Sequence, residues 1–233
     1  PGLTVIIYES IFNQRYQPAS WMEYSVSEFD GLAVRESSFS SNAGQVLAGY
    51  HYFKENQEVN GVVVIAHGLG CGGQNMFMPF ADYFTSNGYL VFAYDATGNG
   101  HSEGETVNGL PQGIIDLDYA LNYVKTQQDY KDLPIVLLGH SWGAYSAGAV
   151  LKLHGDVAAA VLISAPDRSI DLMVQESKKA VGPLTYPAVP YLALYEWVQF
   201  GDYASYGVTD GLESSDAHVL IVHSRDDTTV SPE

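Results

Sequence analysis

Ser141 is the residue whose setting points most directly to chemistry. It lies between two glycines in segment 139–143, GHSWG, which has the form G-x-S-x-G, and an apolar run, IVLL, precedes it. This pattern is typical of a sharp turn from a strand into a helix that exposes a serine hydroxyl as a nucleophile for acyl transfer. Glycine flanks such a turn because a larger side chain would clash there. A glycine turn without a catalytic role is the alternative.

Two backbone N–H groups are candidates to stabilise the oxyanion that such an attack creates. The first belongs to Trp142, at the start of the predicted helix, where the positive end of the helix dipole also lies. The second belongs to Leu69, in the glycine-rich turn 67–73, HGLGCGG, which follows another apolar run. A phosphate-binding loop is the alternative, but this turn lacks the Lys-Ser/Thr pair of a P-loop and the G-x-G-x-x-G spacing. We interpret Cys71 as a small packing residue.

A serine nucleophile also needs a carboxylate that orients a basic histidine. The segment IVHSRDDTTVS places Asp226 and Asp227 directly after an apolar run. We choose Asp227 as the acid, with Asp226 as the second choice and Asp167, at the end of the preceding predicted strand, as the third. A loop-capping role is the alternative for all three carboxylates.

The elements that must position these residues alternate along the chain. A hairpin opens the series, with strands GLAVRESSFSS and VLAGYHYF joined by the turn SNAG. Further apolar runs predict strands over residues 61–68, 89–95, 134–139, 157–164 and 218–224. Apolar residues at helical spacing lie between them: Phe77, Phe80, Ala81 and Phe84, and then Ile114, Leu117, Leu121 and Val124. This alternation predicts one α/β domain over residues 1–233, a three-layer sandwich with a mostly parallel β-sheet.

Residues 166–217 interrupt the alternation and are rich in aromatic side chains. These are Tyr186, Tyr191, Tyr195, Trp197, Phe200, Tyr203 and Tyr206. A connection of this length is expected to have a function of its own, and we interpret its aromatic residues as the wall of an apolar pocket. A plain cover over the sheet is the alternative. At the other end of the chain, residues 1–16 hold a short apolar run, which we interpret as an ordinary edge element in preference to the stub of a removed anchor.

The segments HGLG, DATGNGHSEG, GHSWG and HSRDDTTV, in this order, resemble the motifs of the α/β-hydrolase superfamily. They are most similar to its esterase, lipase and serine-aminopeptidase-like branch, which includes monoglyceride-lipase-like enzymes. The resemblance covers roughly residues 30–233. It implies an α/β-hydrolase fold, with residues 166–217 as a short lid insertion over the active site.

The resemblance also implies roles for individual residues. It implies Ser141 as the nucleophile and the N–H groups of Leu69 and Trp142 as the oxyanion hole. It implies Asp227 as the acid, because residues 227–230, DTTV, fit the family pattern D-x-x-V. Thr97 stands where the family usually has arginine, and we expect this difference to alter a structural contact and not the chemistry.

In this superfamily the catalytic histidine follows the acid, and none of the seven histidines of the chain lies there. His223 is the nearest stand-in, but it belongs to the strand that precedes the acid. The other histidines lie earlier, at positions 51, 67, 101, 140, 154 and 218. We therefore predict that the domain is incomplete at its C-terminus and that the histidine follows a further strand, roughly 20–40 residues beyond Asp227.

Charge and composition narrow the possible partners. The chain has 10 Lys and Arg against 27 Asp and Glu, a net charge of −17, which disfavours nucleic acid and charge-driven docking onto anionic lipid. Its single cysteine excludes an internal disulfide, and no apolar stretch reaches transmembrane length. We predict no cofactor and no metal site. We expect a soluble domain, cytoplasmic or tethered by a removed N-terminal segment, of undetermined oligomeric state.

Together these features predict a serine hydrolase that cleaves carboxylic esters, with an apolar acyl group, through an acyl-enzyme on Ser141. Two alternatives stay open. One is a peptidase or amidase of the same fold, since the same triad cleaves amides. The other is a non-catalytic relative that binds a small apolar ligand.

Overall fold

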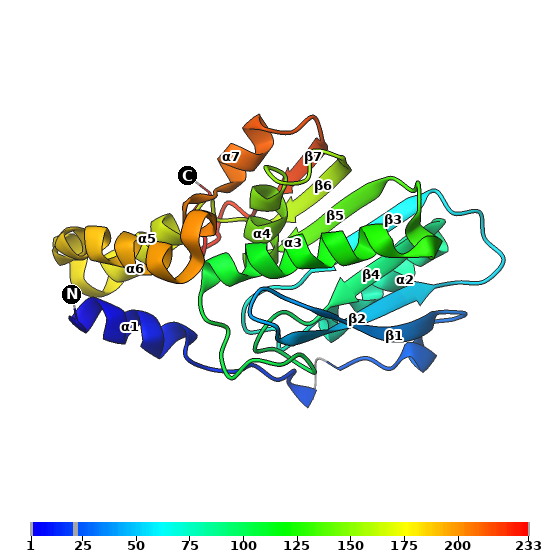
Figure 1. The fold of residues 1–233 in the computed structure, drawn as a ribbon, viewed down its shortest axis with the longest axis horizontal. Coiled ribbons are helices and arrows are strands. Elements are labelled where there is room, and N and C mark those ends of the chain that lie inside the picture. The colour runs from blue at the N-terminus through cyan, green and yellow to red at the C-terminus, as the bar shows by residue number, and fades with distance from the viewer. Residues whose placement is uncertain (1, 21–22, 233) are drawn as a thin grey trace.

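A mixed β-sheet forms the centre of the computed structural model, which describes residues 2–20 and 23–232 (Figure 1). Within these residues the sheet has seven strands in the order β1-β2-β4-β3-β5-β6-β7. Their bounds are β1 (Ala33–Ser40), β2 (Val46–Phe53), β3 (Gly61–Ala66), β4 (Tyr89–Tyr94), β5 (Ile135–His140), β6 (Val157–Ile163) and β7 (His218–Val222). Each predicted strand is present, with ends that differ from the prediction by a few residues.

The opening hairpin is antiparallel and the rest of the sheet is parallel. β1 pairs with β2 and β2 with β4 in antiparallel register, with Gly49 opposite Tyr94. Strands β4, β3, β5, β6 and β7 then run parallel, and Ala66 pairs with Gly139 at the carboxyl ends of β3 and β5. The predicted mostly parallel sheet is confirmed. Its parallel strands end at one edge, which is where open α/β sheets place their sites.

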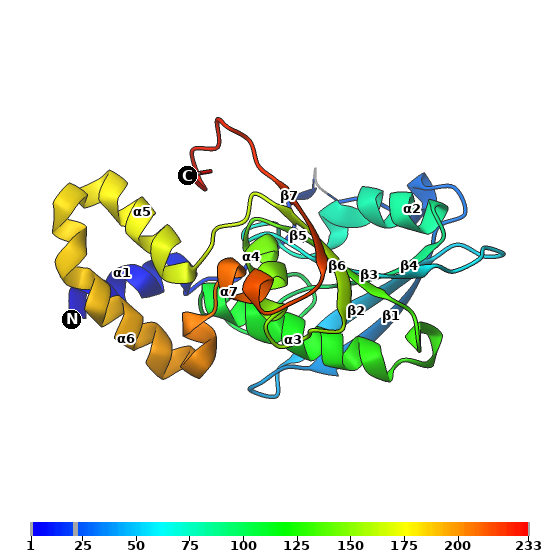
Figure 2. The same ribbon diagram turned by 90° about the horizontal axis from the view of Figure 1, so that it is seen from above.

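Helices cover both faces of the sheet (Figure 2). One face is covered by η3 (Asn75–Phe77) and α2 (Met78–Ser86), and the other by α3 (Leu110–Thr126) and α4 (Trp142–Val150). Because side chains of a strand alternate, Val62 and Val64 of β3 join the core under α3 and α4, whereas Val63 and Ile65 join the core under α2. All four are fully buried, which explains the uninterrupted apolar run. The short helices η2 (Val26–Glu28) and η4 (Gln128–Tyr130) lie in connections.

Residues 164–217, here called the β6–β7 insertion, are mostly helical, and their first helices lie beyond the carboxyl ends of the strands (Figure 1). It consists of α5 (Ser169–Val181), η5 (Gly182–Ala188), α6 (Val189–Phe200), η6 (Gly201–Ser205) and α7 (Val208–Glu213). The break in the sequence pattern therefore corresponds to α5, η5, α6 and η6, whereas α7 packs on α4 and directly precedes β7: a Cβ on Gly211 would lie 2.0 Å from the carbonyl oxygen of Gly148.

The N-terminal segment is a helix and not an edge element, so that expectation is wrong. Helix α1 (Gly2–Phe12) packs against α6, and the rings of Tyr8 and Tyr195 lie 5.3 Å apart. Tyr8 and Phe12 are both buried and lie one helical turn apart, so they share the face that meets the insertion. A helix this short gains most of its stability from such packing, which the local sequence does not reveal. In the part of the chain that the structure describes, no helix is both long and apolar enough to cross a membrane.

Candidate active site

Ser141 connects β5 to α4 in a backbone conformation that is unusual for a side-chain-bearing residue. Its φ is 53° and its ψ is −115°. Its N–H donates to the carbonyl of Ile163 at 2.8 Å, and its carbonyl accepts from the N–H of Tyr145 at 2.9 Å. Conformations of this kind cost about 1–3 kcal/mol and persist only where the surrounding structure imposes them. The hydrogen bonds to β6 and α4 impose this one.

The two glycines of the motif are required by close backbone contacts. A Cβ on Gly139 would lie 2.3 Å from the carbonyl oxygen of Gly143. A Cβ on Gly143 would lie 2.0 Å from the carbonyl oxygen of Ala66. Both distances are far shorter than a van der Waals contact. The steric reason predicted for the glycines is confirmed, and the second contact presses α4 against the end of β3.

The glycine-rich turn 67–73 lies beside Ser141 because β3 and β5 are paired neighbours. Direct contact between the two turns is shown by Gly68, where a Cβ would lie 3.0 Å from Nδ1 of His140. Within the described residues, neither the N–H of Leu69 nor that of Trp142 donates a hydrogen bond to another group. Both donors are thus available to a ligand. The indole of Trp142 is buried and donates to the carbonyl of Leu110 at 2.8 Å, which anchors the start of α4 to α3.

Asp227 follows β7 at the same edge of the sheet. Its Oδ1 accepts hydrogen bonds of 2.9 Å from the N–H groups of both Val230 and Thr229. The N–H of Val230 is the main cause that lowers the pKa of Asp227, with smaller contributions from Thr229, Ser164 and His223. Its carboxylate is therefore ionised at neutral pH.

The negative charge of Asp227 acts on His140, the residue that precedes Ser141. Burial lowers the pKa of His140, and the negative charge of Asp227 acts in the opposite direction on this pKa. The neighbouring strands β5, β6 and β7 bring the two residues together. A carboxylate in this position is suited to orient a cationic group near the serine.

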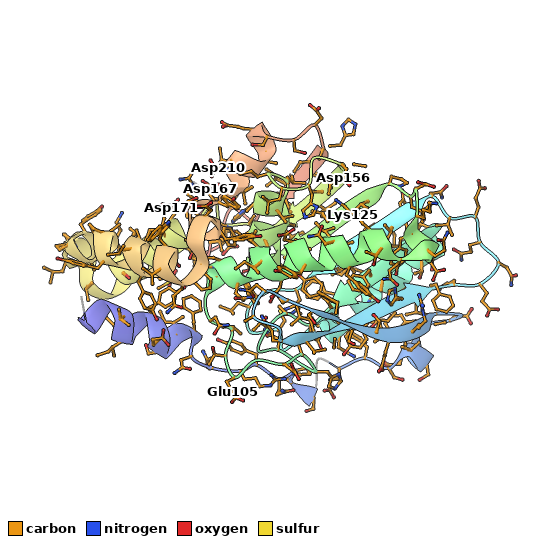
Figure 3. All side chains as sticks on the ribbon, in the orientation of Figure 1. Glu105, Lys125, Asp156, Asp167, Asp171 and Asp210 are labelled. Atoms are coloured by element: carbon orange, nitrogen blue, oxygen red, sulfur yellow. The ribbon has the colours of Figure 1, made fainter. Side chains whose placement is uncertain are left out.

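The other two carboxylate candidates have different surroundings. Asp226 is exposed, and its N–H donates to Oγ of Ser224. Asp167 anchors α7: its Oδ1 accepts from the N–H of Thr209 at 2.7 Å and its carbonyl accepts from the N–H of Val208. Figure 3 shows Asp167 and Asp210 together at this junction. Asp167 therefore has the capping role that we gave as the alternative for the three carboxylates.

Three histidines lie at the carboxyl ends of β3, β5 and β7, and their ring nitrogens have different partners. His67 donates from Nδ1 to the carbonyl of Gly68, and its Nε2 accepts from the N–H of Ala96 at 3.0 Å. The ring centroid of His140 lies 6.2 Å from that of Phe77 in η3, and its Nδ1 is buried without a hydrogen-bond partner among the described residues. His223 donates from Nε2 to the carbonyl of Val230 at 2.9 Å and lies 3.6 Å from Oδ2 of Asp227. A ring nitrogen that donates in this way is not available as a base.

The remaining histidines are engaged elsewhere or lie at the other edge of the sheet. His51 contacts Ser37 and Tyr130, and burial lowers its pKa to about 4. His101 bonds to Tyr50, and His154 bonds to Asp118. His218 begins β7 and is exposed, at the end of the strand opposite Asp227. Within residues 2–20 and 23–232, no group of three or more His, Cys, Asp or Glu side chains could hold a metal ion.

A segment that the sequence did not single out, residues 14–18, supports the glycine-rich turn. A Cβ on Gly72 would lie 2.2 Å from backbone atoms of Gln17 and Pro18. Tyr16 exchanges backbone hydrogen bonds with Gly98 and Gly100. No local pattern in the sequence marks these contacts, because they join residues more than fifty positions apart along the printed chain.

Residues 57–231 match the family described as serine aminopeptidase, S33. The chain belongs to this family. It is 32% identical over 123 residues to a caffeoylshikimate esterase of Arabidopsis thaliana, a match that covers 52% of the chain and 36% of the relative. It is 32% identical over 114 residues to the monoglyceride lipase of Homo sapiens, which covers 48% of the chain and 37% of the relative.

Other relatives agree with this family of hydrolases. A monoacylglycerol lipase of Mycolicibacterium smegmatis is 30% identical over 162 residues, covering 66% of the chain and 56% of the relative. The chain thus spans about a third to just over half of the length of these curated relatives. An esterase of Pyrococcus furiosus superposes with a TM-score of 0.68 at 18% identity, covering 94% of the chain and 80% of that protein. This likeness shows the α/β-hydrolase fold.

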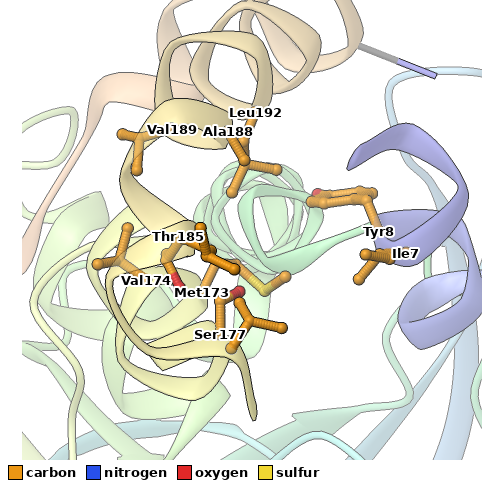
Figure 4. Close-up of a pocket in the computed structure, with 11 residues that line it drawn as sticks. Ile7, Tyr8, Met173, Val174, Ser177, Thr185, Ala188, Val189 and Leu192 are labelled. Atoms are coloured by element: carbon orange, nitrogen blue, oxygen red, sulfur yellow. The ribbon is translucent and has the colours of Figure 1, made fainter. Parts of the chain in front are cut away.

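The β6–β7 insertion and α1 enclose an apolar cavity that was not predicted from the sequence (Figure 4). The cavity lies between α1, α5, η5 and α6, and its lining is mainly aliphatic. Among the described residues, none of the seven aromatic residues named for the insertion lines it. Tyr186, Tyr191 and Trp197 are exposed instead, and Phe200 is buried in the core. Trp197 and Phe200 border two other hollows of the surface, so an aromatic pocket wall in the insertion stays a prediction.

Proposed function

We propose that this protein is a serine hydrolase that cleaves carboxylic esters through an acyl-enzyme on Ser141. The observation that carries the proposal is the strained conformation of Ser141 beside two unpaired backbone N–H groups. Ser141 has a positive φ, a conformation that glycine would adopt with less strain. The presence of serine here suggests that its hydroxyl is needed. The esterase and lipase names of the relatives support an ester as the substrate class.

The proposed reaction has two acyl-transfer steps. The Oγ of Ser141 attacks the ester carbonyl carbon, its proton passes to the general base, and the oxyanion accepts from the N–H groups of Leu69 and Trp142. Collapse of this intermediate breaks the ester C–O bond and releases the alcohol, which takes the proton. Water then attacks the acyl-enzyme by the same route and releases the acid. Asp227 orients the base and stabilises its cationic form.

Covalent labelling of the intact protein tests the nucleophile. A fluorophosphonate probe should attach to Ser141, and Ser141→Ala should abolish both labelling and ester hydrolysis, with a loss in turnover of about six orders of magnitude. Ser205→Ala, in the insertion, is the matched control and should label normally. Labelling that persists in Ser141→Ala would rule out the assignment, and a natural protein that does not label would favour the non-catalytic ligand-binding alternative.

The choice between an ester and an amide substrate needs a separate assay. The family description names aminopeptidases, so peptidase activity is the second candidate. Short- to medium-chain p-nitrophenyl esters should be cleaved with a much higher kcat/KM than aminoacyl p-nitroanilides. The relatives named as esterase and lipase support this order of preference. A preference for the anilides would assign the protein to the peptidase group.

A further inference from the structure

The hollow that Phe200 borders, here called the amide hollow, lies where the β1–β2 turn, the connection from β4 to α3 and the end of α6 meet. Its volume is about 330 Å³, which falls within the range of about 300–1,000 Å³ for pockets that hold small ligands. Among the described residues, five amide side chains and one aromatic ring dominate its lining: Asn42, Gln45, Asn108, Gln112, Gln199 and Phe200. None of the residues proposed to act in ester hydrolysis belongs to this described lining.

The described lining of the amide hollow contains no charged side chain. This contrasts with the whole chain, which has 27 Asp and Glu and a net charge of −17. The carboxylate of Asp116 accepts hydrogen bonds from Thr97 and Gln112, which both line the hollow, but Asp116 itself is completely buried and does not. A charged ligand would find no ion-pair partner in this lining, so the hollow is suited to a neutral ligand.

Hydrogen bonds between the side chains of the amide hollow fix the orientation of Asn42. Its Oδ1 accepts from Nε2 of Gln45 at 3.2 Å and from Nε2 of Gln112 at 3.1 Å. Gln45 also donates to Oγ1 of Thr97 at 3.0 Å, and Gln112 also donates to Oδ1 of Asp116 at 2.8 Å. Because the oxygen of Asn42 is occupied by two donors, its NH₂ group is left as the part that a ligand can use. Side chains held in this way lose little further freedom when a ligand binds.

Three exposed amides of the hollow keep hydrogen-bonding groups for a ligand. Within the described part of the chain, the NH₂ groups of Asn42 and Asn108 donate to no other group, although the oxygen of each accepts hydrogen bonds. Gln199 donates from Nε2 to the hydroxyl of Tyr195 at 3.2 Å, and its Oε1 has no donor among the described residues. Because Asn42, Asn108 and Gln199 are all exposed and line the hollow, two donors and one acceptor are accessible there.

Thr97 keeps the amide hollow open and neutral. The family resemblance places an arginine at this position, and Thr97 lines the hollow. A long cationic side chain here would reduce the space and add a charge. In this chain the short side chain instead bonds to Asp116 and Gln45, which orders the amides beside it.

A ligand with several hydroxyl groups matches this lining, because a hydroxyl, like an amide side chain, both donates and accepts. A cavity of about 150 Å³ holds a benzene ring, so 330 Å³ admits one six-membered ring with its hydroxyl groups. We propose that the amide hollow binds one ring of a neutral sugar, with its hydroxyls on Asn42, Asn108 and Gln199 and its carbon atoms against Phe200. This binding forms no covalent bond and does not depend on the ester hydrolysis proposed above.

Titration calorimetry of the intact protein with four methyl glycosides tests the ligand class. The probes are methyl β-D-glucopyranoside, methyl β-D-galactopyranoside, methyl α-D-mannopyranoside and methyl β-D-xylopyranoside, and glycerol is the comparison, since it has hydroxyls but no ring. At least one glycoside should bind with a millimolar Kd, and glycerol should bind about tenfold more weakly or worse. If none of the four glycosides binds, or if glycerol binds as tightly as the best of them, the proposal is wrong.

Variants of the exposed amides test which groups hold the best-bound glycoside. Asn42→Ala and Gln199→Ala should each weaken its binding about two- to tenfold, because each removes one hydrogen bond. Gln128→Ala, which changes an exposed amide of η4 outside the hollow, is the matched control and should bind normally. Unchanged affinity in both Asn42→Ala and Gln199→Ala, or an equal loss in Gln128→Ala, would overturn the assignment.

A variant that fills the amide hollow tests its location. Ala43→Trp, in the exposed β1–β2 turn that lines the hollow, should abolish glycoside binding. Gln57→Trp, in the exposed connection from β2 to β3, is the control and should bind normally. Retained affinity in Ala43→Trp would refute the site. The fluorophosphonate probe should label Ser141 equally in Ala43→Trp and in the natural protein, and glycoside binding by a protein that does not label would leave this proposal intact.

Discussion

At the scale of single residues, Ser141 combines backbone strain with a hydroxyl that makes no hydrogen bond to any described residue. Its φ of 53° is a conformation that glycine adopts without strain. Its hydroxyl makes no hydrogen bond within the described residues, although the backbone on both sides is held by β6 and α4. Selection for stability alone would favour glycine here. The hydroxyl is therefore expected to have a functional role.

This strain predicts an unusual order of stability for two inactive variants. Both Ser141→Gly and Ser141→Ala remove the hydroxyl, but only glycine relieves the strain, so Ser141→Gly should be more stable by about 1 kcal/mol. Urea unfolding at neutral pH measures the difference. Ser86, in the right-handed helix α2, is the matched control, where glycine should be less stable than alanine. If Ser141→Ala were as stable to urea as Ser141→Gly, or more stable, the argument from backbone strain would be contradicted.

At the scale of elements, a buried carboxylate joins three helices of the cavity region. Oε1 of Glu196 in α6 accepts from Tyr8 in α1 at 3.1 Å and from Ser169 in α5 at 2.5 Å. Burial raises the pKa of Glu196, and the hydrogen bonds from Ser169 and Tyr8 offset part of this effect. The carboxyl group of Glu196 therefore links α1 to the insertion. When it ionises, a charge is buried, which is unfavourable.

The raised pKa predicts how Glu196→Gln changes stability with pH. A folded-state pKa above the unfolded value means that the folded protein binds more protons, so the stability contribution falls as pH rises above the ordinary pKa of about 4.3. Glutamine keeps an oxygen for both hydroxyl donors and cannot ionise. The Tm of Glu196→Gln relative to the natural protein should thus increase from pH 4 to pH 8, by about 2 °C or more. Glu213→Gln, which changes an exposed glutamate, is the control. The difference in Tm between this variant and the natural protein should stay constant from pH 4 to pH 8. If the Tm of Glu196→Gln relative to the natural protein decreased from pH 4 to pH 8, the predicted direction of the pKa shift of Glu196 would be wrong.

At the scale of the whole molecule, the serine, the acid and the two N–H donors gather at one edge of the sheet, but a base does not. Both ring nitrogens of His67 and the Nε2 of His223 form hydrogen bonds, and no histidine follows Asp227 within the printed sequence. Strand β7 pairs only with β6 among the described residues and exposes about half of Leu220, Ile221 and Val222. An apolar, half-paired strand can accept a further strand beside it. We propose that the catalytic histidine belongs to residues outside positions 1–233 and is brought to Asp227 by such a strand.

A comparison of two chain lengths tests this proposal. A protein that ends at Glu233 should hydrolyse p-nitrophenyl esters about four or more orders of magnitude more slowly than one with all residues encoded after Glu233. Circular dichroism must show that both proteins are folded. If the shorter protein has the full rate and His223→Ala alone among the histidine variants stops it, His223 is the base and the proposal is wrong.

The parts of the site that the sequence predicted best depend on local sterics. The turn at Ser141 needs glycine at position 139 because the carbonyl of Gly143, four residues on, leaves no room for a Cβ, and at position 143 because the carbonyl of Ala66 at the end of the neighbouring strand β3 does the same. The strands around it are apolar on both faces because helices cover both sides of the sheet. Such requirements leave a pattern within about ten residues, which the sequence displays directly.

Other features arose only from contacts between distant segments. Tyr8 and Glu196 are 188 positions apart, and nothing near either residue indicates that they meet. The same is true of the cavity, whose wall combines α1 with the insertion. Among the three carboxylate candidates, Asp167 looked similar to Asp227 until its hydrogen bonds to the start of α7 were known.

The sequence by itself thus determined the order of the elements, the edge of the sheet where the candidate site lies and the turn that carries Ser141. Each of these follows from short-range sterics or from the periodic burial of apolar side chains. Tertiary structure alone decided that α1 is a helix on the insertion, which partners occupy the histidines, and that Thr185 is left with an unpaired hydroxyl beside a cavity. These outcomes depend on which distant surfaces bury one another, and their free energy comes from packing that no local segment encodes.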